Sequence, residues 1–355
     1  MSLNLSVDLE NMYSILQNFP QQIREAIEIG KRLQLNKKID INNIVYCGMG
    51  GSAISGDFVK NYLRGDLKIP IEVVRNYTLP GYVDEYSLVI LVSYSGNTEE
   101  TISCFNEAVE KKARVVCVSS DGKIKDMYDQ LISREERIAF IEVPKGYPPR
   151  TAFGYLFVPL VFLLNKMGYI PDNYTKEIED SIDFLDECAE RFDLENSPNY
   201  PYELALSLMN RIPIIYGVAD STDVIARRWT TQFSENSKIL AYYNSLPEMN
   251  HNEIVGWENL KELLKNFNIV FLKDSGDHDR IKLRQNITKK LLVDKNDELL
   301  PNKVIEVNSK GNTLLERWLY LVYLGDFISW YIAIMFETDP TPVQKIDILK
   351  KSLSQ

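Results

Sequence analysis

The feature that most constrains the fold is an alternation of short apolar runs and helix-length segments between residues 44 and 143. Strands separated by helices form right-handed βαβ units, whose parallel sheet is covered by helices on both faces. This pattern predicts an α/β domain with three layers. The predicted strands are Ile44–Cys47, Ile71–Arg75, Leu88–Ser93, Arg114–Ser119 and Ile138–Val143.

The second half of the chain repeats this pattern. Ile212–Gly217 resembles Ile44–Gly48 as a strand and turn, and the helical segment Ser221–Phe233 resembles Ser52–Tyr62. A chain of 355 residues has room for roughly two domains. We therefore expect two tandem domains, each a flavodoxin-like parallel sheet between helical layers. Further strands are predicted at Ile239–Tyr243, Ile269–Lys273 and Val304–Val307.

We place the domain limits from composition and helical periodicity. The first domain, with its leading helices, is predicted to span residues 1–170. An acidic connecting helix over 171–195 follows, and the second domain covers 196–355. Its closing helices are predicted at Leu314–Phe336 and Val343–Leu353.

Charge and hydropathy limit the partners. The formal net charge is -10, which disfavours binding to nucleic acid. Thr151–Met167 comes closest to the ~18 apolar residues of a membrane span, but it holds Asn165 and Lys166 and predicts a buried helix. The first residues lack a basic region followed by an apolar one, so we expect no secretory signal and a cytoplasmic protein without a membrane partner.

Cysteine and histidine usage points away from metal chemistry. The four cysteines form no CxxC pair, and none lies near either histidine, His251 or His278. We therefore expect free buried thiols, no disulfide framework, and neither a metal nor another cofactor.

Ser93–Thr101 follows an apolar strand and precedes a helix. Free N–H groups at a helix start and the helix dipole favour an anion, and the hydroxyls of Ser93, Ser95 and Thr98 add donors. Gly96 lets the backbone approach a ligand closely. The segment predicts a phosphate site, although the same residue types also form ordinary capped turns.

A second glycine-rich turn, Gly48–Asp57, also joins a strand to a helix. Gly48 and Gly50 could begin a dinucleotide-binding fingerprint, but its third position is Ala53. No acidic residue closes the next strand, Ile71–Arg75, to bind a ribose. We therefore favour a sugar phosphate over a nucleotide.

Several other residues could carry chemistry, and each also has an ordinary structural explanation. Arg150 ends the proline-rich segment 144–150, and Glu235 follows a helix. Such side chains often pair at the surface or are simply solvated. His251 lies in a polar segment, where a lone histidine is usually exposed, and Lys345 and Lys350 lie on the last predicted helix, where lysines favour solubility.

Taken together, these segments resemble the bifunctional phosphoglucose/phosphomannose isomerases, which are built from two sugar isomerase (SIS) domains. The resemblance covers nearly the whole chain. It rests on six stretches in this order: Cys47–Ala53, Ser93–Thr101, Pro149–Arg150, Ser234–Lys238, Asn250–Glu253 and Ile346–Lys350. Glu235 and His251 are the discriminating pair, because many SIS proteins bind phosphosugars without catalysing a reaction.

The resemblance implies interconversion of glucose 6-phosphate or mannose 6-phosphate with fructose 6-phosphate through a cis-enediol. Glu235 would move the proton between C1 and C2, Arg150 would stabilise the enediolate, and His251 with Lys350 would open the sugar ring. Lys345 is the alternative lysine. The implied substrate-binding residues are Ser52, Ser93, Ser95 and Thr98 for the phosphate, with Gly50 and Gly51 beside them.

The family resemblance also suggests a homodimer in which His251 enters the neighbouring subunit's site. Two alternatives stay open at this point. One is an isomerase of another phosphosugar, which would share the phosphate turn. The other is a non-catalytic sugar-phosphate sensor, which would have no use for Glu235 and His251.

Overall fold

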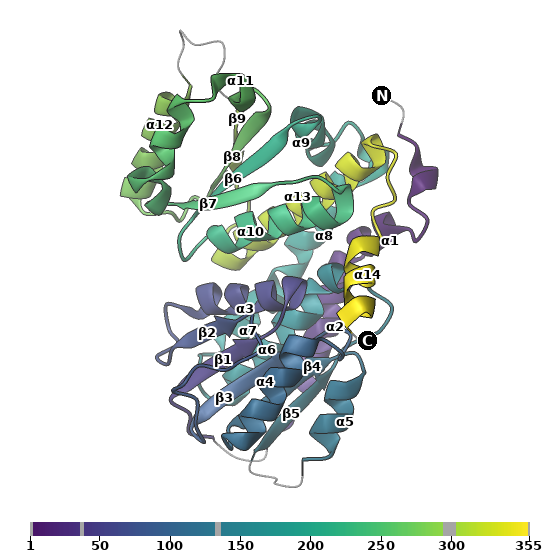
Figure 1. The fold of residues 1–355 in the computed structure, drawn as a ribbon, viewed down its shortest axis with the longest axis vertical. Helices are drawn as coiled ribbons and strands as arrows, with labels where there is room; N and C mark the ends of the chain where they lie inside the picture. The colour runs from purple at the N-terminus through teal and green to yellow at the C-terminus, as the bar shows by residue number, and fades with distance from the viewer. Residues whose placement is uncertain (1–2, 36–38, 132–135, 294–302, 354–355) are drawn as a thin grey trace. The chain divides into compact units, whose positions relative to one another are not determined.

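The computed structural model describes residues 3–35, 39–131, 136–293 and 303–353. By its packing, the chain divides into two compact units, one of residues 18–186 and one of residues 1–17 with 187–355. The predicted limits group the first 17 residues with the first domain instead. Figure 1 traces both units.

The first unit is built around a parallel sheet of five strands in the order β2-β1-β3-β4-β5. The chain moves outward from β1 to β2 on one side and then from β3 to β5 on the other. Its strands are β1 Asn43–Cys47, β2 Ile71–Val74, β3 Ser87–Val92, β4 Arg114–Ser119 and β5 Arg137–Glu142. Its helices are α2 Phe19–Arg32, α3 Gly50–Leu63, α4 Glu99–Glu110, α5 Lys123–Asp129, α6 Phe153–Lys166 and α7 Asn173–Asp180.

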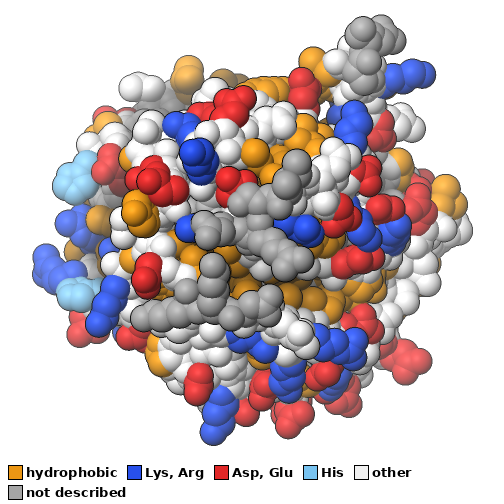
Figure 2. Space-filling model, turned by 90° about the horizontal axis from the view of Figure 1, so that it is seen from below, with side chains coloured by type: hydrophobic (Ala, Val, Ile, Leu, Met, Phe, Trp, Pro, Cys, Tyr) orange, Lys and Arg blue, Asp and Glu red, His pale blue; other side chains and the backbone are white. Residues whose placement is uncertain are grey.

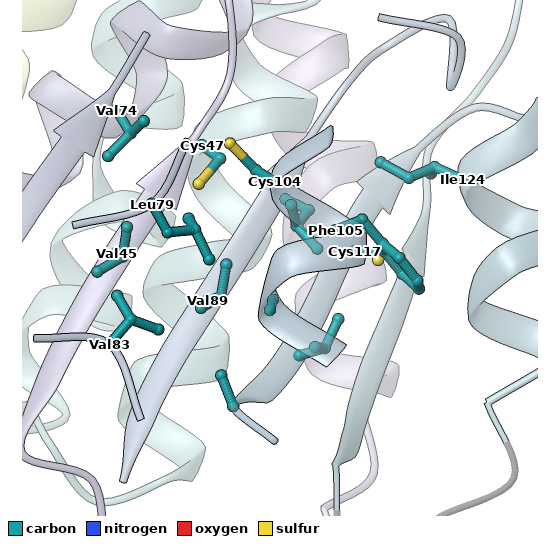
Figure 3. Packing of buried hydrophobic residues seen from close by; sticks show 14 of the residues in the cluster. Val45, Cys47, Val74, Leu79, Val83, Val89, Cys104, Phe105, Cys117 and Ile124 are labelled. Carbon is teal, nitrogen blue, oxygen red and sulfur yellow. The ribbon is translucent and has the colours of Figure 1, made fainter. Parts of the chain in front are cut away.

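Helices cover both faces of this sheet. On one face, β1, β3 and β4 pack against α4 and α5 through a cluster that includes Val89, Phe105 and Ile124 (Figure 3). On the other face, Gly56 of α3 lies directly against the ring of Tyr46, where any Cβ would collide. α3 and α2 pack in turn against α6. These layers confirm the predicted three-layer α/β fold.

The second unit contains a parallel sheet of four strands in the order β7-β6-β8-β9. It reproduces the outward order of the first sheet, as the repeat in the sequence predicts. Its strands are β6 Ile212–Val218, β7 Tyr242–Leu246, β8 Phe267–Lys273 and β9 Lys303–Asn308. Its helices are α1 Met12–Gln17, α9 Tyr200–Leu208, α10 Asp223–Gln232, α11 Lys261–Leu264, α12 Asp279–Leu292, α13 Leu314–Met335 and α14 Gln344–Leu353.

Three expectations differ from the structure. The predicted strand Ile239–Tyr243 was wrong by three residues, because a helical turn over Phe233–Ser237 delays the start of β7 to Tyr242. The expected single helix over 171–195 is two, α7 and α8 (Ile182–Phe192), with Ser181 between them. The prediction that residues 151–167 come closest to a membrane span was also wrong, because α13 is longer.

α13 is long and apolar enough, by length and composition, to cross a membrane. Its apolar stretch is wholly buried inside the protein, however, and the core helix of a soluble protein meets the same criteria. Trp229 of α10 packs on it at Gly325 and donates a hydrogen bond from Nε1 to the carbonyl of Leu321 at 2.8 Å. We therefore interpret α13 as the central core helix of its unit.

Candidate active site

The two polar turns singled out in the sequence meet at one edge of the first sheet. β1 and β3 are neighbours, and the chain leaves them in opposite directions across the sheet. Gly48, which follows β1, lies so close to the end of β3 that a Cβ would be 3.0 Å from the carbonyl oxygen of Val92. Parallel α/β sheets bind ligands at this type of reversal, outside the carboxyl ends of the strands.

The turn after β3 is organised by two hydroxyl side chains. Ser93 Oγ lies 2.8 Å from Thr98 Oγ1, and the Thr98 N–H donates to Ser93 Oγ at 3.3 Å. Ser93 is fully buried, Thr98 is half-buried and Ser95 is exposed. No side chain caps the N-terminus of α4. The first hydrogen bond between residues four apart in this helix runs from the Ile102 N–H to the Thr98 carbonyl. The N–H groups of the first turn therefore point outward beside these hydroxyls.

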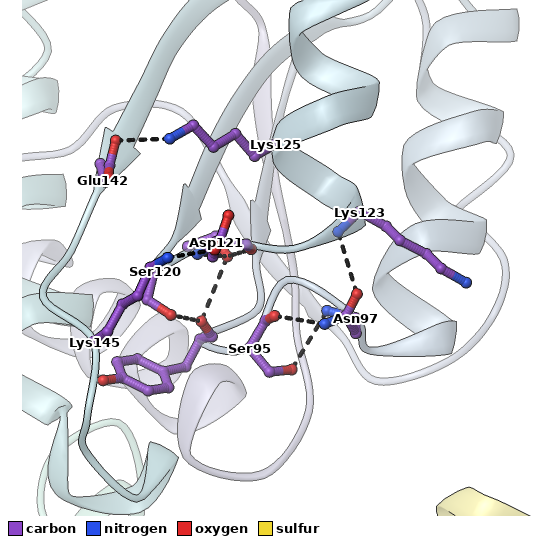
Figure 4. A network of polar contacts seen from close by, with 10 residues as sticks. Ser95, Asn97, Ser120, Asp121, Lys123, Lys125, Glu142 and Lys145 are labelled. Carbon is purple, nitrogen blue, oxygen red and sulfur yellow. Dashed lines mark hydrogen bonds and ion pairs between the residues drawn. The ribbon is translucent and has the colours of Figure 1, made fainter.

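The same turn is fixed to the loop after β4, as Figure 4 shows. Asn97 donates from Nδ2 to the Ser95 carbonyl at 2.9 Å and accepts the Lys123 N–H at Oδ1 at 3.2 Å. Gly96, with φ +69°, accepts the Ile124 N–H at 3.0 Å. The backbone of the candidate phosphate turn is thus held in place before any ligand binds, which lowers the cost of ordering it.

The turn after β1 brings a second uncapped helix start to this edge. Gly50 takes φ +51°, and no side chain caps α3. Ser52 is 6% exposed, and its carbonyl accepts hydrogen bonds from Tyr46 Oη at 2.9 Å and from Ser55 Oγ at 2.7 Å. Two helix N-termini beside four hydroxyl side chains make a site suited to an anion such as a phosphate monoester.

Arg150 lies beside this site, in the 3₁₀ turn Pro149–Thr151. Gly51 packs on its backbone, since a Cβ on Gly51 would lie 3.1 Å from the Arg150 Cα. Arg150 is 3% exposed. This burial argues against a solvated arginine that pairs with a carboxylate at the surface. A buried guanidinium keeps its charge and offers donors in a fixed plane.

Glu235 belongs to the second unit and is half-buried. We expected it between a helix and a strand, but it lies within a π-helical turn, Phe233–Ser237, that continues α10. α13 fixes the residues that follow it: Asn236 Nδ2 donates to Ser329 Oγ at 2.9 Å, and Ser237 Oγ donates to the Ser329 carbonyl at 2.6 Å. Such π-helical turns are rare and often occur at functional sites.

The remaining candidates lie at the surface of the second unit. His251 ends the 3₁₀ turn Glu248–His251 and is exposed, and Lys345 and Lys350 are exposed on α14. His278 caps α12, because its Nδ1 accepts the Arg280 N–H at 3.1 Å. Histidine side chains are visible in pale blue on the face in Figure 2, among interspersed acidic and basic side chains.

Seven predicted residues are collected at one edge of the first unit: Gly50, Gly51, Ser52, Ser93, Ser95, Thr98 and Arg150. Glu235, His251 and Lys350 belong to the second unit. Sequence reasoning missed the residues that support the site. Asn97 could have been found from its place in the turn, but Lys238, which donates from Nζ to the carbonyls of Glu235 and Pro340, could not. Among the described residues, no group of three or more His, Cys, Asp or Glu side chains could hold a metal ion.

Comparison with known proteins supports the presence of two SIS domains in tandem. Residues 39–136 match the family described as SIS domain, and residues 198–353 match the bacterial phospho-glucose isomerase C-terminal SIS domain. The C-terminal domain of glucosamine-fructose-6-phosphate aminotransferase from Francisella tularensis has a similar fold. Its TM-score is 0.71 at 16% identity, with 93% of this chain and 98% of that chain covered.

Two relatives are similar over almost their whole length, and both are named bifunctional phosphoglucose/phosphomannose isomerase. The protein from Caldicellulosiruptor bescii is 42% identical over 97% of this chain and 99% of its own. The protein from Aquifex aeolicus is 39% identical over 98% of this chain and 99% of its own. This chain therefore belongs to the family of bifunctional phosphoglucose/phosphomannose isomerases.

Proposed function

We propose that this protein is an aldose–ketose isomerase that interconverts glucose 6-phosphate and mannose 6-phosphate with fructose 6-phosphate. The observation that carries the proposal is the pairing of Ser93 with Thr98 at the start of α4, beside the N-terminus of α3. This arrangement suits a phosphate monoester. The two relatives named above and the order of the motifs support the same activity.

In this proposal the phosphate binds to Ser52, Ser93, Ser95 and Thr98, with Gly50 and Gly51 allowing its close approach. Glu235 takes the proton from C2 of the open-chain aldose and, after this proton has exchanged with solvent, delivers a proton to C1, while a hydroxyl proton passes from O2 to O1. The product is the ketose. Such a carbon acid is weak, so the base must be held close and the enediolate charge must be neutralised.

Arg150 supplies that positive charge in our proposal, because a guanidinium stays protonated and presents fixed donors. His251 and Lys350 assist ring opening, which moves a proton between the ring oxygen and a hydroxyl group. Lys345 is the alternative to Lys350. An imidazole suits this step because its ordinary pKa lies near neutrality. No step needs a metal or a redox cofactor.

The route of the proton gives a direct test. When fructose 6-phosphate is converted in D₂O, an enediol mechanism places solvent deuterium at C2 of the aldose products, which NMR detects. A Glu235→Gln variant should lose nearly all turnover, whereas Glu262→Gln, which changes an exposed carboxylate on α11, should not. Products free of deuterium would contradict an enediol route in which the proton on Glu235 exchanges with solvent. A fully active Glu235→Gln variant would remove Glu235 from the role of base.

We further propose that the protein is a cytoplasmic homodimer and that each His251 acts in the partner's site. Mixing two inactive variants, Glu235→Gln and His251→Ala, tests this. If His251 acts across the interface, a hybrid dimer has one site with both wild-type residues and regains activity. If His251 acts within its own chain, no hybrid site is complete and the mixture stays inactive.

A further inference from the structure

The segment that carries Arg150 is held before and after the arginine by two buried side chains. Tyr94, which lies between Ser93 and Ser95 in the candidate phosphate turn, holds the N-terminal part. Its Oη donates to the Pro144 carbonyl at 2.7 Å and accepts the Tyr147 N–H at 2.9 Å. The Tyr94 hydroxyl therefore pairs with one backbone acceptor and one backbone donor of the segment, which lie six and three residues before Arg150.

Tyr94 is itself firmly placed. It is 6% exposed, and its carbonyl accepts the Ser120 N–H at 3.0 Å and the Ser120 Oγ at 2.7 Å. Burial raises the pKa of Tyr94, which keeps the side chain in its phenol form, able to donate. The phosphate turn, the loop after β4 and the Arg150 segment are thus joined through this one residue.

Gln22 holds the segment on the other side of Arg150. This residue of α2 is 3% exposed. Its Nε2 donates to the Thr151 carbonyl at 2.9 Å, and its Oε1 accepts the Gly154 N–H at 2.7 Å. Both partners are backbone groups, one and four residues after Arg150, and they would otherwise be buried without a hydrogen bond.

Between these two contacts, the Arg150 backbone meets α3. A Cβ on Gly51 would lie 3.1 Å from the Arg150 Cα and 3.3 Å from the Pro149 carbonyl oxygen, so residue 51 has little room for a side chain. Contacts with Tyr94, Gln22 and Gly51 therefore fix the position of the backbone around Arg150. Misplacing a catalytic group by 1 Å can cost about 100-fold in rate.

We propose that Tyr94 and Gln22 are positioning residues that set the location of Arg150, and that Tyr94 ties that location to the phosphate turn. The inference rests on the proposed function for its effect on rate, but the contacts themselves are independent of it. Neither side chain is proposed to touch the reacting atoms. Both act through the backbone on which the guanidinium is carried.

The test compares Tyr94→Phe and Gln22→Met with a matched control. Tyr174→Phe removes a hydroxyl of similar burial in the same unit, which donates to Asp66 Oδ2 at 3.0 Å away from the site. Tyr94→Phe is expected to lower kcat by about 10-fold with KM for fructose 6-phosphate unchanged. Ser120 still holds the turn, so phosphate binding should persist. Tyr174→Phe should lower stability without changing kcat.

A double-mutant cycle distinguishes positioning from a general structural role. Arg150→Ala alone is expected to cost about 100-fold or more in kcat. Because Tyr94 is proposed to act through Arg150, adding Tyr94→Phe to Arg150→Ala should cause no further loss. Additive losses, an unchanged kcat in Tyr94→Phe, or a raised KM with unchanged kcat would each overturn the inference.

Amide hydrogen exchange of residues 144–154 supplies a readout that needs no turnover. Tyr94→Phe should speed exchange in this segment, because the Tyr147 N–H loses its acceptor, and Gln22→Met should do so at Gly154. Unchanged exchange in Tyr94→Phe would overturn the inference even in an active enzyme. An inactive wild-type protein whose exchange responds as expected would refute the proposed function and leave the positioning intact.

Discussion

The carbonyl oxygen of Asp121 occupies the place where a side chain on residue 96 would begin: a Cβ built on Gly96 falls 1.6 Å from it. The loop after β4 therefore packs directly on the candidate phosphate turn. Ser119 Oγ donates to that same carbonyl at 2.6 Å, which fixes its direction. A glycine is required here both by this contact and by φ +69°.

Replacing Gly96 with alanine should therefore disrupt the turn. The left-handed conformation alone costs an alanine about 1–2 kcal/mol, and the collision with Asp121 adds to this. We expect Gly96→Ala to lower the thermal midpoint and to abolish stabilisation by inorganic phosphate in a thermal-shift experiment. Gly146→Ala is the matched control, because Gly146 has φ +96° and open space around it. Equal behaviour of the two variants would contradict the close packing.

Ser93→Ala removes the hydroxyl that joins Thr98 to the end of β3. We expect KM for fructose 6-phosphate to rise about 10-fold, equivalent to about 1.4 kcal/mol of lost binding, and stability to fall by about 1 kcal/mol. Steady-state kinetics and urea unfolding measure the two effects. Ser181→Ala is the control, since Ser181 is as buried and donates to the Ile178 carbonyl. It should lose similar stability while KM stays at the wild-type value.

A buried ion pair joins α10, the helix that leads into the Glu235 turn, to α13. Asp326 accepts hydrogen bonds from Arg228 Nη2 at 2.7 Å and Gln232 Nε2 at 2.6 Å. Removing one member of a buried pair costs about 3–5 kcal/mol, so Asp326→Ala should shift the urea midpoint strongly. Glu187→Ala, which breaks an exposed pair with Arg191, should cost less than about 1 kcal/mol. Equal costs would mean that the buried pair contributes no more than the exposed one.

Asp277 gives a pH dependence of stability. Burial and the charge of Asp274 raise the pKa of Asp277 to about 6, against 3.8 ordinarily. The folded protein binds the Asp277 proton more tightly than the unfolded chain does. The stability that this proton contributes is therefore fully present below pH 3.8 and is lost as the pH rises through 6. Asp277→Asn should therefore be more stable than the wild type by about 2–3 kcal/mol at about pH 8, and not at about pH 4.

Urea unfolding at several pH values measures this difference, and Asp279→Asn is the control. The side chain of Asp279 is 98% exposed, so that variant should follow the wild type across the range. A stability gain in Asp277→Asn that does not vary with pH would show that the effect is not electrostatic.

Much of the fold could be predicted because strand signals in a buried parallel sheet are local. Arg114–Ser119 was predicted at its observed limits, and Leu88–Ser93 was off by one residue at each end. β7 was misplaced because the π-helical turn after α10 depends on hydrogen bonds to α13, distant in sequence. α13 was overlooked as the helix nearest to a membrane span because Asp326 interrupts its apolar run, and only the structure shows that carboxylate paired with Arg228.

In the candidate site too, contacts between residues close in sequence could be predicted, and contacts between distant residues could not. Ser93 and Thr98 could be predicted as neighbours because they lie five residues apart around a strand-to-helix turn. Tyr94 and Gln22 could not be predicted as supports of Arg150, because their partners lie 50 to 132 residues away. A buried glutamine in a helix has no sequence signature of the carbonyl it will meet.

The most direct measurement is a coupled assay of the EDTA-treated protein with fructose 6-phosphate, in which glucose 6-phosphate and mannose 6-phosphate are followed separately. Our account predicts that both products form and that both disappear in Glu235→Gln, a variant that should still be stabilised by phosphosugar. Glucose 6-phosphate alone would contradict the second activity. Neither product from folded, phosphosugar-binding protein would contradict the isomerase itself.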